Sequence, residues 1–224
     1  MRIDIITVLP ELMKSPFEAS IMKRSIAAGI VQVYFHNLRD YTSDNYKSID
    51  DTQYGGGAGM VMQVKPIRDC LEKVKELEPQ TKVIYLSPQG EPLNQQLVEK
   101  LAKFESLTLL CGRYEGVDER IIENDVDYEI SIGDYVISGG ELASMVLIDA
   151  VSRRLDNVLG NKDSLNDSFT DSLLDHPHYT RPESVDGDSV PEVLLSGNQA
   201  KIDAWRKEQA IKKTKQNRPD ILSN

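Results

Sequence analysis

A glycine-rich segment, Tyr54 to Gly59, is the first part of the sequence that could do chemistry. It reads YGGGAG, and glycines permit positive φ angles and close approach of the backbone to a ligand. It is not the dinucleotide-binding fingerprint, because the polar residues Asp50 to Thr52 precede it where that fingerprint requires a strand. It is not a phosphate-binding P-loop either, because no Gly-Lys-Ser/Thr follows. Taken alone, the segment predicts a tightly folded turn.

Three further loops each follow an expected strand. Ser87–Gly90 comes after a strand ending at Leu86, Gly112–Gly116 after one ending at Cys111, and Gly133–Tyr135 after one ending at Ile132. Each loop alone is compatible with an ordinary strand-to-helix turn. The carboxyl ends of parallel strands gather at one edge of a sheet, so the three loops together predict one ligand pocket. Backbone amides there suit an adenine edge and a ribose, and the carboxylate of Glu115 suits a cationic ligand.

Other charged and metal-ligating residues have weaker local signals. Asp167 begins the segment Asp-Ser-Phe in an acidic stretch, where a carboxylate is usually solvated. Arg153 and Arg154 end an apolar helix, where the helix dipole favours cations. His176-Pro177-His178 is disfavoured as a metal site, because proline fixes the backbone and the sequence reveals no third ligand.

Strands and helices alternate along the first 155 residues. This alternation predicts an α/β domain with a mostly parallel sheet, followed by a small helical C-terminal unit. The segment Arg39–Gln63 has no sustained period and is expected to be a long functional loop. The expected strands are Arg2–Leu9, Ile30–Leu38, Lys82–Leu86, Leu107–Cys111 and Tyr128–Ile132, and the expected helices are Ser15–Gly29, Pro66–Glu78, Leu93–Phe104, Glu141–Leu155 and Asn198–Thr214.

The character of the sequence changes near residue 160, where a domain boundary is expected. The stretch 156–190 holds eight acidic residues against two basic ones and reads as a linker or mobile loop, whereas 201–218 holds seven basic residues against two acidic ones. The formal net charge of −10 argues against a general nucleic-acid binder. A local RNA-binding face and a solvated charged helix both remain compatible with the basic stretch.

Bulk features restrict the class of protein. The sequence has no run of about 20 apolar residues of the kind that crosses a bilayer. Its beginning, MRIDIITVLPELM, has neither the apolar core nor the cleavage site of a secretory signal, so we expect no membrane association and a cytoplasmic protein. Cys70 and Cys111 are therefore expected to be small buried apolar residues and not a disulfide.

Several long strings in the chain are too specific to be generic. Together they closely resemble the bacterial tRNA (guanine-N1)-methyltransferase family, of the knotted SPOUT class, from the first residues to about Arg206. The strings are IDIITVLPELM, DDTQYGGGAGMVMQ, VIYLSPQG, LLCGRYEGVDERII, ISIGDYVISGGELASMVLIDAVSR, DSF, LLDHPHYTRP and VPEVLLSGNQAKIDAWR.

The resemblance implies the architecture and the reaction. The sheet would carry a deep trefoil knot within a catalytic domain at 1–160, followed by a flexible linker at 161–172 and a small helical tRNA-binding domain at 173–224. The enzyme would be an obligate homodimer with an active site shared between subunits. It would bind the anticodon stem-loop of tRNA and move a methyl group from S-adenosylmethionine to N1 of guanine 37, immediately 3′ of the anticodon.

The resemblance also implies roles for individual residues. Asp167 would be the general base that removes the N1 proton, and Arg153 would stabilise the charge that develops on O6. Mg²⁺ is implied as a second cofactor, although the sequence shows no dedicated metal motif. The flipped guanine and its neighbour would be held by Asp50, Tyr54, Gly55, Gly56, Gly57 and Ser168. The methyl donor would be held by Tyr85, Leu86, Ser87, Pro88, Gly112, Tyr114, Glu115, Gly116, Ile132, Gly133, Asp134, Tyr135, Val136, Ile137, Gly139 and Gly140.

Three other functions compete with this interpretation. A knotted methyltransferase for another RNA position is disfavoured by the match through the YGGGAG and DSF segments. A non-catalytic binding module is disfavoured by the presence of Asp167 and Arg153. An NAD-dependent oxidoreductase is disfavoured because the dinucleotide fingerprint is missing from the first strand-to-helix turn.

Overall fold

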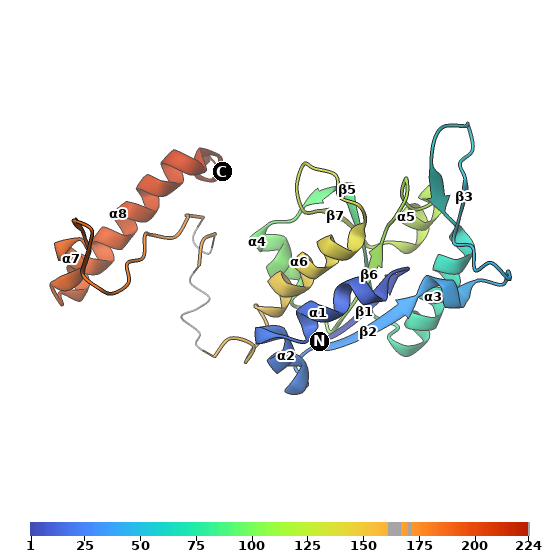
Figure 1. Cartoon of the computed structure of the whole chain (residues 1–224), viewed down its shortest axis with the longest axis horizontal. Coiled ribbons are helices and arrows are strands. Elements are labelled where there is room, and N and C mark those ends of the chain that lie inside the picture. Colours follow the sequence, from blue (N-terminus) through green and yellow to red (C-terminus); the bar gives the residue numbers. More distant parts are fainter. Residues whose placement is uncertain (161–166, 170–171, 224) are drawn as a thin grey trace. The chain divides into compact units, whose positions relative to one another are not determined.

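The computed structural model describes residues 1–160, 167–169 and 172–223. The chain divides into two compact units, Met1–Gly160 and Asn161–Asn224, and each is described by itself (Figure 1). The linker expected at 161–172 falls largely on 161–166 and 170–171, which lie outside the described residues.

The first unit is built on a five-stranded sheet with the strand order β2-β1-β6-β5-β7. All neighbouring strands are parallel, which confirms the predicted α/β class with a mostly parallel sheet. The central strand β6 has the sequence SLTLLC and is buried at every position; continuous apolar strands of this kind are covered on both faces. The strands are β1 (Arg2–Thr7), β2 (Gln32–Asn37), β5 (Lys82–Pro92), β6 (Ser106–Cys111) and β7 (Tyr128–Ser131).

Helices cover both faces of this sheet (Figure 1). Side chains alternate along a strand, so Ile3 and Ile5 of β1 join one core while Ile6 joins the other. The first core is closed by α1 (Lys14–Phe17), α2 (Ser20–Ala27), α4 (Gln95–Leu101) and α6 (Gly140–Ser152), and the second by α3 (Val64–Leu77) and α5 (Glu119–Asp125). The 3₁₀ helices η1 (Pro10–Met13) and η2 (Leu38–Tyr41) follow β1 and β2. Cys70 and Cys111 are free and buried, as predicted.

Three expectations for the first unit are wrong in detail. The strand expected at 82–86 continues to Pro92, so the expected loop Ser87–Gly90 lies within β5, where the pairing with β7 shifts register between Leu86 and Glu91. The single helix expected at 15–29 is two short helices, α1 and α2, because Ala19 has an extended backbone and Ser20 adopts a left-handed φ of 52°. The loop expected at 39–63 contains an antiparallel hairpin of β3 (Asp50–Thr52) and β4 (Met60–Met62). Its strands are only three residues long, too short to show a period in the sequence.

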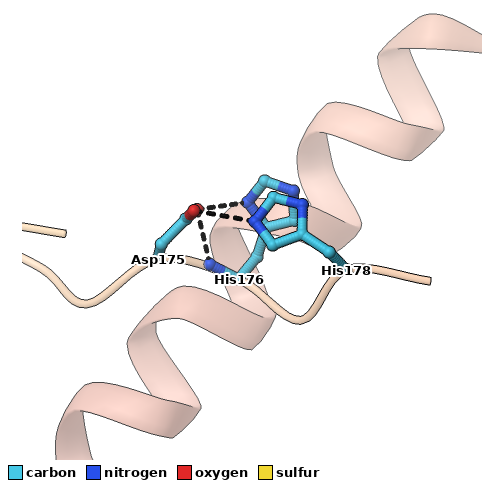
Figure 2. Close-up of side chains that lie close together, drawn as sticks. All are labelled: Asp175, His176 and His178. Carbon is cyan, nitrogen blue, oxygen red and sulfur yellow. Dashed lines mark hydrogen bonds and ion pairs between the residues drawn. The ribbon is translucent and has the colours of Figure 1, made fainter. Parts of the chain in front are cut away.

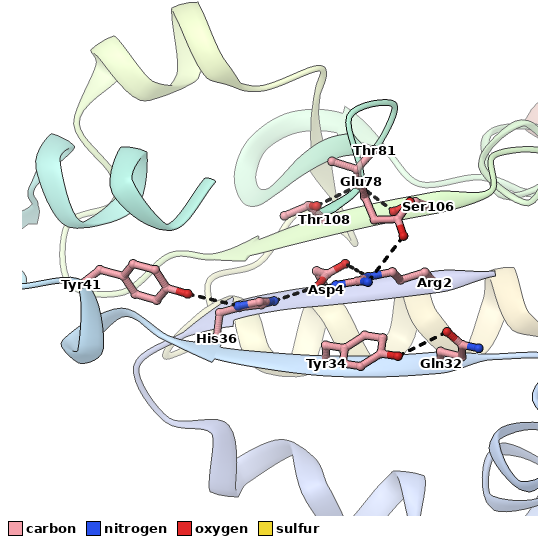
Figure 3. A network of polar contacts seen from close by, with 10 residues as sticks. All are labelled: Arg2, Asp4, Gln32, Tyr34, His36, Tyr41, Glu78, Thr81, Ser106 and Thr108. Carbon is pink, nitrogen blue, oxygen red and sulfur yellow. Dashed lines mark hydrogen bonds and ion pairs between the residues drawn. The ribbon is translucent and has the colours of Figure 1, made fainter. Parts of the chain in front are cut away.

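A network of polar residues crosses β1 and β2 on the face covered by α3 (Figure 3). The fully buried carboxylate of Asp4 accepts a hydrogen bond from Arg2 Nε at 2.7 Å and lies 2.7 Å from His36 Nε2. Arg2 also reaches Glu78 at 3.4 Å. Although burial opposes ionisation, the hydrogen bonds from His36 and Arg2 hold the pKa of Asp4 below its ordinary value. The network therefore keeps a buried charge compensated.

The second unit is dominated by the long helix α8 (Gln199–Asn217). It confirms the helix expected at 198–214, and Asn198 caps its start, because the side chain of Asn198 accepts a hydrogen bond from Lys201 N at 3.2 Å. Not all of 156–190 is loop: β8 (Ser184–Val185) and β9 (Asp188–Ser189) form a hairpin around Asp186-Gly187, a typical tight-turn pair. The remaining elements are α7 (Glu192–Leu195) and η4 (Pro219–Ser223). Throughout the described residues, no helix has the length and apolar character needed to span a bilayer.

Candidate active site

A cavity of about 350 Å³ lies at the ends of β6 and β7, beside the irregular middle of β5, where the pairing with β7 shifts register between Leu86 and Glu91. The three loops expected to hold the methyl donor come together around it. Asp134 is the one residue of that predicted set that is not among those lining the cavity. The predicted residues that line it are Tyr85, Leu86, Ser87, Pro88, Gly112, Tyr114, Glu115, Gly116, Ile132, Gly133, Tyr135, Val136, Ile137, Gly139 and Gly140.

Close backbone packing joins the loops to one another. Gly140 N donates a hydrogen bond to Gly112 O at 2.9 Å, which ties the loop after β7 to the loop after β6. A Cβ atom on Gly140 would lie 2.8 Å from Cys111 Cα and 3.0 Å from Gly112 N. These are backbone atoms that cannot swing away, so only glycine fits at position 140. Here the glycine in the sequence marks a close approach of two chain segments.

A buried ion pair beneath the cavity escaped the sequence reasoning. Glu141, in the first turn of α6, is 1% exposed. Its carboxylate accepts hydrogen bonds from Arg113 Nε at 3.1 Å and from Thr7 Oγ1 at 2.8 Å. Arg113 is itself one of the residues that line the cavity. The available signal was a lone carboxylate at the start of an otherwise apolar helix, where the helix dipole favours a negative charge.

The strand β4, which follows the glycine-rich loop, is bonded to the cavity loop after β6. Met62 N donates to Gly116 O at 2.9 Å, and Glu115 N donates to Met60 O at 3.0 Å. A Cβ atom on Gly59 would overlap the carboxylate of Glu115. The structure therefore places the Gly59 end of the glycine-rich loop beside the loop expected to hold the donor, whereas Asp50 and Tyr54–Gly57 are not among the residues that line the cavity.

Residues of the glycine-rich loop have the conformations that only glycine adopts easily. Gly55, Gly56 and Gly57 have φ angles of 85°, 78° and 125°, and Tyr54 beside them is fully exposed. The premise that no strand precedes this loop is wrong, because Asp50–Thr52 is β3. That strand pairs antiparallel with β4 and lies outside the parallel sheet, so the dinucleotide fingerprint is still absent.

The two arginines after α6 have different surroundings. Arg153 is the half-buried C-cap residue, and its N–H donates to Asp149 O at 3.1 Å. The side chain of Arg154 pairs with Glu99 of α4 at 2.9 Å. Arg154 thus bridges two helices, a structural role that suits the second arginine of the pair.

Asp167 and Ser168 belong to the second unit. Asp167 is exposed, whereas the hydroxyl of Ser168 accepts a hydrogen bond from Asp175 N at 3.0 Å. Phe169 N donates to Leu173 O at 2.7 Å. These bonds define the turn that carries Asp167.

The whole chain, residues 1–224, matches the family model described as tRNA (Guanine-1)-methyltransferase TrmD. The chain belongs to the TrmD family. Similar proteins named tRNA (guanine-N(1)-)-methyltransferase occur in Flavobacterium johnsoniae, at 56% identity over 99% of both chains, and in Flavobacterium psychrophilum, at 55% identity over 100% of both. Another from Nitrosospira multiformis is 53% identical over 98% of this chain and 88% of its own length.

A methyltransferase of the TrmD family needs a methyl donor, and the cavity fits a donor of nucleoside size. Its volume is within the range of about 300–1,000 Å³ found for small-molecule sites. Gly112 and Gly140 let the segments of its wall pack closely, because a Cβ at either position would meet atoms of Tyr85 or Cys111 within 3 Å. Leu86, Ile132 and Ile137 supply apolar surface beside polar backbone. This combination suits a ligand with a flat apolar ring and polar edges.

The TrmD-family chain also contains a cluster that its sequence did not reveal (Figure 2). The carboxylate of Asp175 lies 2.7 Å from His176 Nδ1 and 2.8 Å from His178 Nε2. The premise that His176 and His178 have no third candidate ligand is therefore wrong. Burial lowers the pKa of His176. Although burial opposes ionisation, hydrogen bonds from His178 and the His176 N–H hold the pKa of Asp175 below its ordinary value.

Proposed function

We propose that this chain transfers the methyl group of S-adenosylmethionine to N1 of guanine 37, immediately 3′ of the anticodon, in tRNA. The family match over residues 1–224 supports the reaction class. The observation that carries the proposal is the cavity at the ends of β6 and β7 and the middle of β5, with β4 bonded to the cavity loop after β6. The proposed substrate places the reaction in the cytoplasm.

S-adenosylmethionine would supply an activated methyl group on a positively charged sulfur. The three cavity loops would hold it, with Tyr85–Pro88, Gly112–Gly116 and Ile132–Gly140 in contact with it. Asp134 lies between the lining residues Gly133 and Tyr135 and would contact the donor from there. The loop at Tyr54–Gly57, with Asp50 behind it and Ser168 beside the base, would hold the extruded guanine. The chain's contribution is to align the two reactants.

Asp167 and Arg153 would carry the proton and charge changes. Guanine N1 bears a proton, and its lone pair becomes available for methylation as that proton leaves. Asp167 would accept the proton on its carboxylate. Arg153 would donate a charge-assisted hydrogen bond to O6, where the negative charge accumulates. The products are N1-methylguanine in tRNA, the demethylated donor and a protonated Asp167, which returns its proton to water.

No step is assigned to Mg²⁺. Within the described part of the chain, the one cluster of side chains suited to a metal ion contains two imidazoles. Mg²⁺ prefers oxygen ligands in octahedral geometry, so this cluster does not fit it.

We also propose that the first unit is a knotted domain that dimerises through α6. Tight threading is supported by Gly90, because a Cβ there would overlap the backbone of Glu129 and Ile130 in β7. Dimerisation is supported by Leu142 and Val146, which are 55% and 50% exposed on a helix whose opposite side is buried. A shared active site would follow if α6 of each subunit packs beside its partner's cavity.

The second unit would bind the tRNA backbone as a small helical domain at 173–224, joined to the catalytic domain at 1–160 by the linker at 161–172. Its helix α8 supports this role, because 201–218 has seven basic residues and two acidic ones. Lys and Arg side chains neutralise phosphates without reading sequence. A basic helix of this kind explains how a chain with a net charge of −10 can bind tRNA.

The test of the proposed roles is methyl transfer from labelled S-adenosylmethionine to an unmodified tRNA transcript with guanines at positions 36 and 37. Asp167→Asn should lower kcat by about 100-fold or more, as expected for loss of a general base. The matched control is Asp186→Asn, an exposed aspartate in the same unit. Undiminished transfer by Asp167→Asn would show that Asp167 is not the general base. Absence of transfer by the wild type would favour the alternative of a non-catalytic binding module.

A further inference from the structure

Three potential metal ligands converge in the second unit, in the segment Asp175–His178. The candidate ligand atoms of Asp175, His176 and His178 all lie within 4.8 Å of one another. Figure 2 shows both imidazole rings turned toward the one carboxylate. The ring centroids of the two histidines are 4.4 Å apart, at an interplanar angle of 43°. The rings therefore offer nitrogens to the same small volume.

The backbone of this segment is held from both sides. Asp175 N donates to Ser168 Oγ at 3.0 Å, and Leu174 N donates to Thr214 Oγ1 of α8 at 2.9 Å. On the other side, the ring of Tyr179 lies 6.4 Å from that of Trp205 on α8. Pro177 between the histidines has a fixed φ angle. These restraints reduce the conformational entropy that three ligands would otherwise lose on binding an ion.

Only small side-chain movements would convert the cluster into a coordination sphere. Nitrogen and oxygen ligands lie at about 2.0–2.2 Å from zinc, so in a tetrahedron they are about 3.3 Å apart. The two imidazole nitrogens contact different oxygens of Asp175, Oδ1 at 2.7 Å and Oδ2 at 2.8 Å. Each contact would lengthen by about half an ångström, and the carboxylate would turn to present one oxygen to the ion. His176 would bind through Nδ1 and carry its proton on Nε2, and His178 would bind through Nε2 and carry its proton on Nδ1.

We propose that Asp175, His176 and His178 bind a zinc-class divalent cation, Zn²⁺ or Co²⁺, with water completing the sphere. Two imidazoles and one carboxylate form a ligand set that suits such ions. The site is independent of the proposed methyl-donor cavity, because its three ligands all belong to the second unit. The side chains are 28%, 20% and 70% exposed, in chain order. An ion in solution can therefore reach the ligands without local unfolding.

The cluster also lies next to the turn that carries Asp167. Ser168 accepts the hydrogen bond from Asp175 N, so an ion that restrains Asp175 would restrain this turn as well. The effect on the turn bears on catalysis only through the proposed role of Asp167. Binding of the ion does not depend on that role and can be measured without tRNA or methyl donor.

The test is a titration of the full-length, tag-free and chelator-treated chain with Zn²⁺ by calorimetry and with Co²⁺ by visible absorption. We expect one saturable equivalent and a ligand-field band with Co²⁺. His176→Asn, His178→Asn and Asp175→Asn should each weaken binding by about tenfold or more. The matched control, Asp188→Asn, removes an exposed carboxylate of the same unit and should bind as the wild type does.

Circular dichroism establishes that each variant is folded before its titration is interpreted. Folded His176→Asn and His178→Asn proteins that bind with wild-type affinity would overturn the proposal, since the ion would then occupy another site. Absence of saturable binding by the wild type would overturn it as well. Mg²⁺ should give no saturable heat at the concentrations that saturate the chain with Zn²⁺.

Discussion

The carboxylate of Glu141 accepts a hydrogen bond from Arg113 Nε at 3.1 Å, although the two residues are 28 positions apart in the sequence. Thr7 Oγ1 donates to the same carboxylate at 2.8 Å. The end of β1, the loop after β6 and the first turn of α6 thus meet at one buried charge. This arrangement sets the position of a residue, Arg113, that lines the cavity.

Glu141→Gln should therefore affect donor binding more than the chemical step. The substitution leaves the Arg113 guanidinium without its buried partner, and breaking such pairs costs about 3–5 kcal/mol of stability. We expect KM for S-adenosylmethionine to rise by about tenfold, with a smaller change in kcat. Glu123→Gln, an exposed residue of α5, is the control. Equal losses in kcat and kcat/KM with an unchanged KM would contradict a positioning role for Glu141.

Gly140→Ala should disrupt the close contact between the cavity loop after β6 and the cavity loop after β7. The added Cβ would lie 2.8 Å from Cys111 Cα, and overpacking of this kind costs about 1–3 kcal/mol. We predict a lower midpoint of urea unfolding and weaker donor binding by calorimetry. Gly160→Ala is the matched control, because its Cβ would meet no atom within 4 Å. Wild-type affinity in Gly140→Ala would show that the two loops do not need this contact.

The exposed apolar side of α6 leads to a prediction about assembly. Leu142→Glu combined with Val146→Glu should shift the proposed dimer to monomer, because two charges would be buried in an apolar interface without partners. The control is Leu77→Glu, which changes an apolar side chain of similar exposure, 54%, on α3. It should leave the molecular mass of the assembly in solution unchanged. Sedimentation analysis of the three proteins distinguishes these outcomes. A dimer that persists in the double variant would place the interface elsewhere.

Some features could be predicted from the sequence because local chemistry determines them. The largely apolar run at Leu107–Cys111 predicted a strand of a mostly parallel sheet, and glycine-containing loops after consecutive strands predicted a shared pocket. The Glu141 ion pair and the Asp175 cluster could not be predicted, since they depend on side-chain directions across tertiary contacts. The β3–β4 hairpin was missed because three-residue strands show no periodicity and are stabilised by their contact with the loop after β6.

The buried Asp4 should make stability depend on pH. Its native pKa is below the ordinary value of 3.8. The contribution of the Asp4 carboxylate to the free energy of unfolding is therefore fully present above pH 4 and is lost as the pH falls through the native pKa. Asp4→Asn should lower the free energy of unfolding by about 3 kcal/mol at pH 7.

Urea unfolding at pH 7 and at pH 3, followed by circular dichroism, checks this contribution of Asp4. The difference in the free energy of unfolding between wild type and Asp4→Asn should be smaller at pH 3 than at pH 7. Asp69→Asn breaks the exposed pair with Lys65 and should cost about 0.5 kcal/mol or less at either pH. A difference between wild type and Asp4→Asn that stays constant with pH would show that the charge of Asp4 does not stabilise the fold.

The most direct test of the proposed function is to locate the transferred methyl group. The wild-type chain would be incubated with deuterium-labelled S-adenosylmethionine and two tRNA transcripts, one with guanine at position 37 and one with adenine there. Nuclease digestion and mass spectrometry then identify the modified nucleotide. The proposal predicts labelled 1-methylguanosine at position 37 of the first transcript and none in the second. Label at another nucleotide, equal label in both transcripts, or no label in either would contradict it.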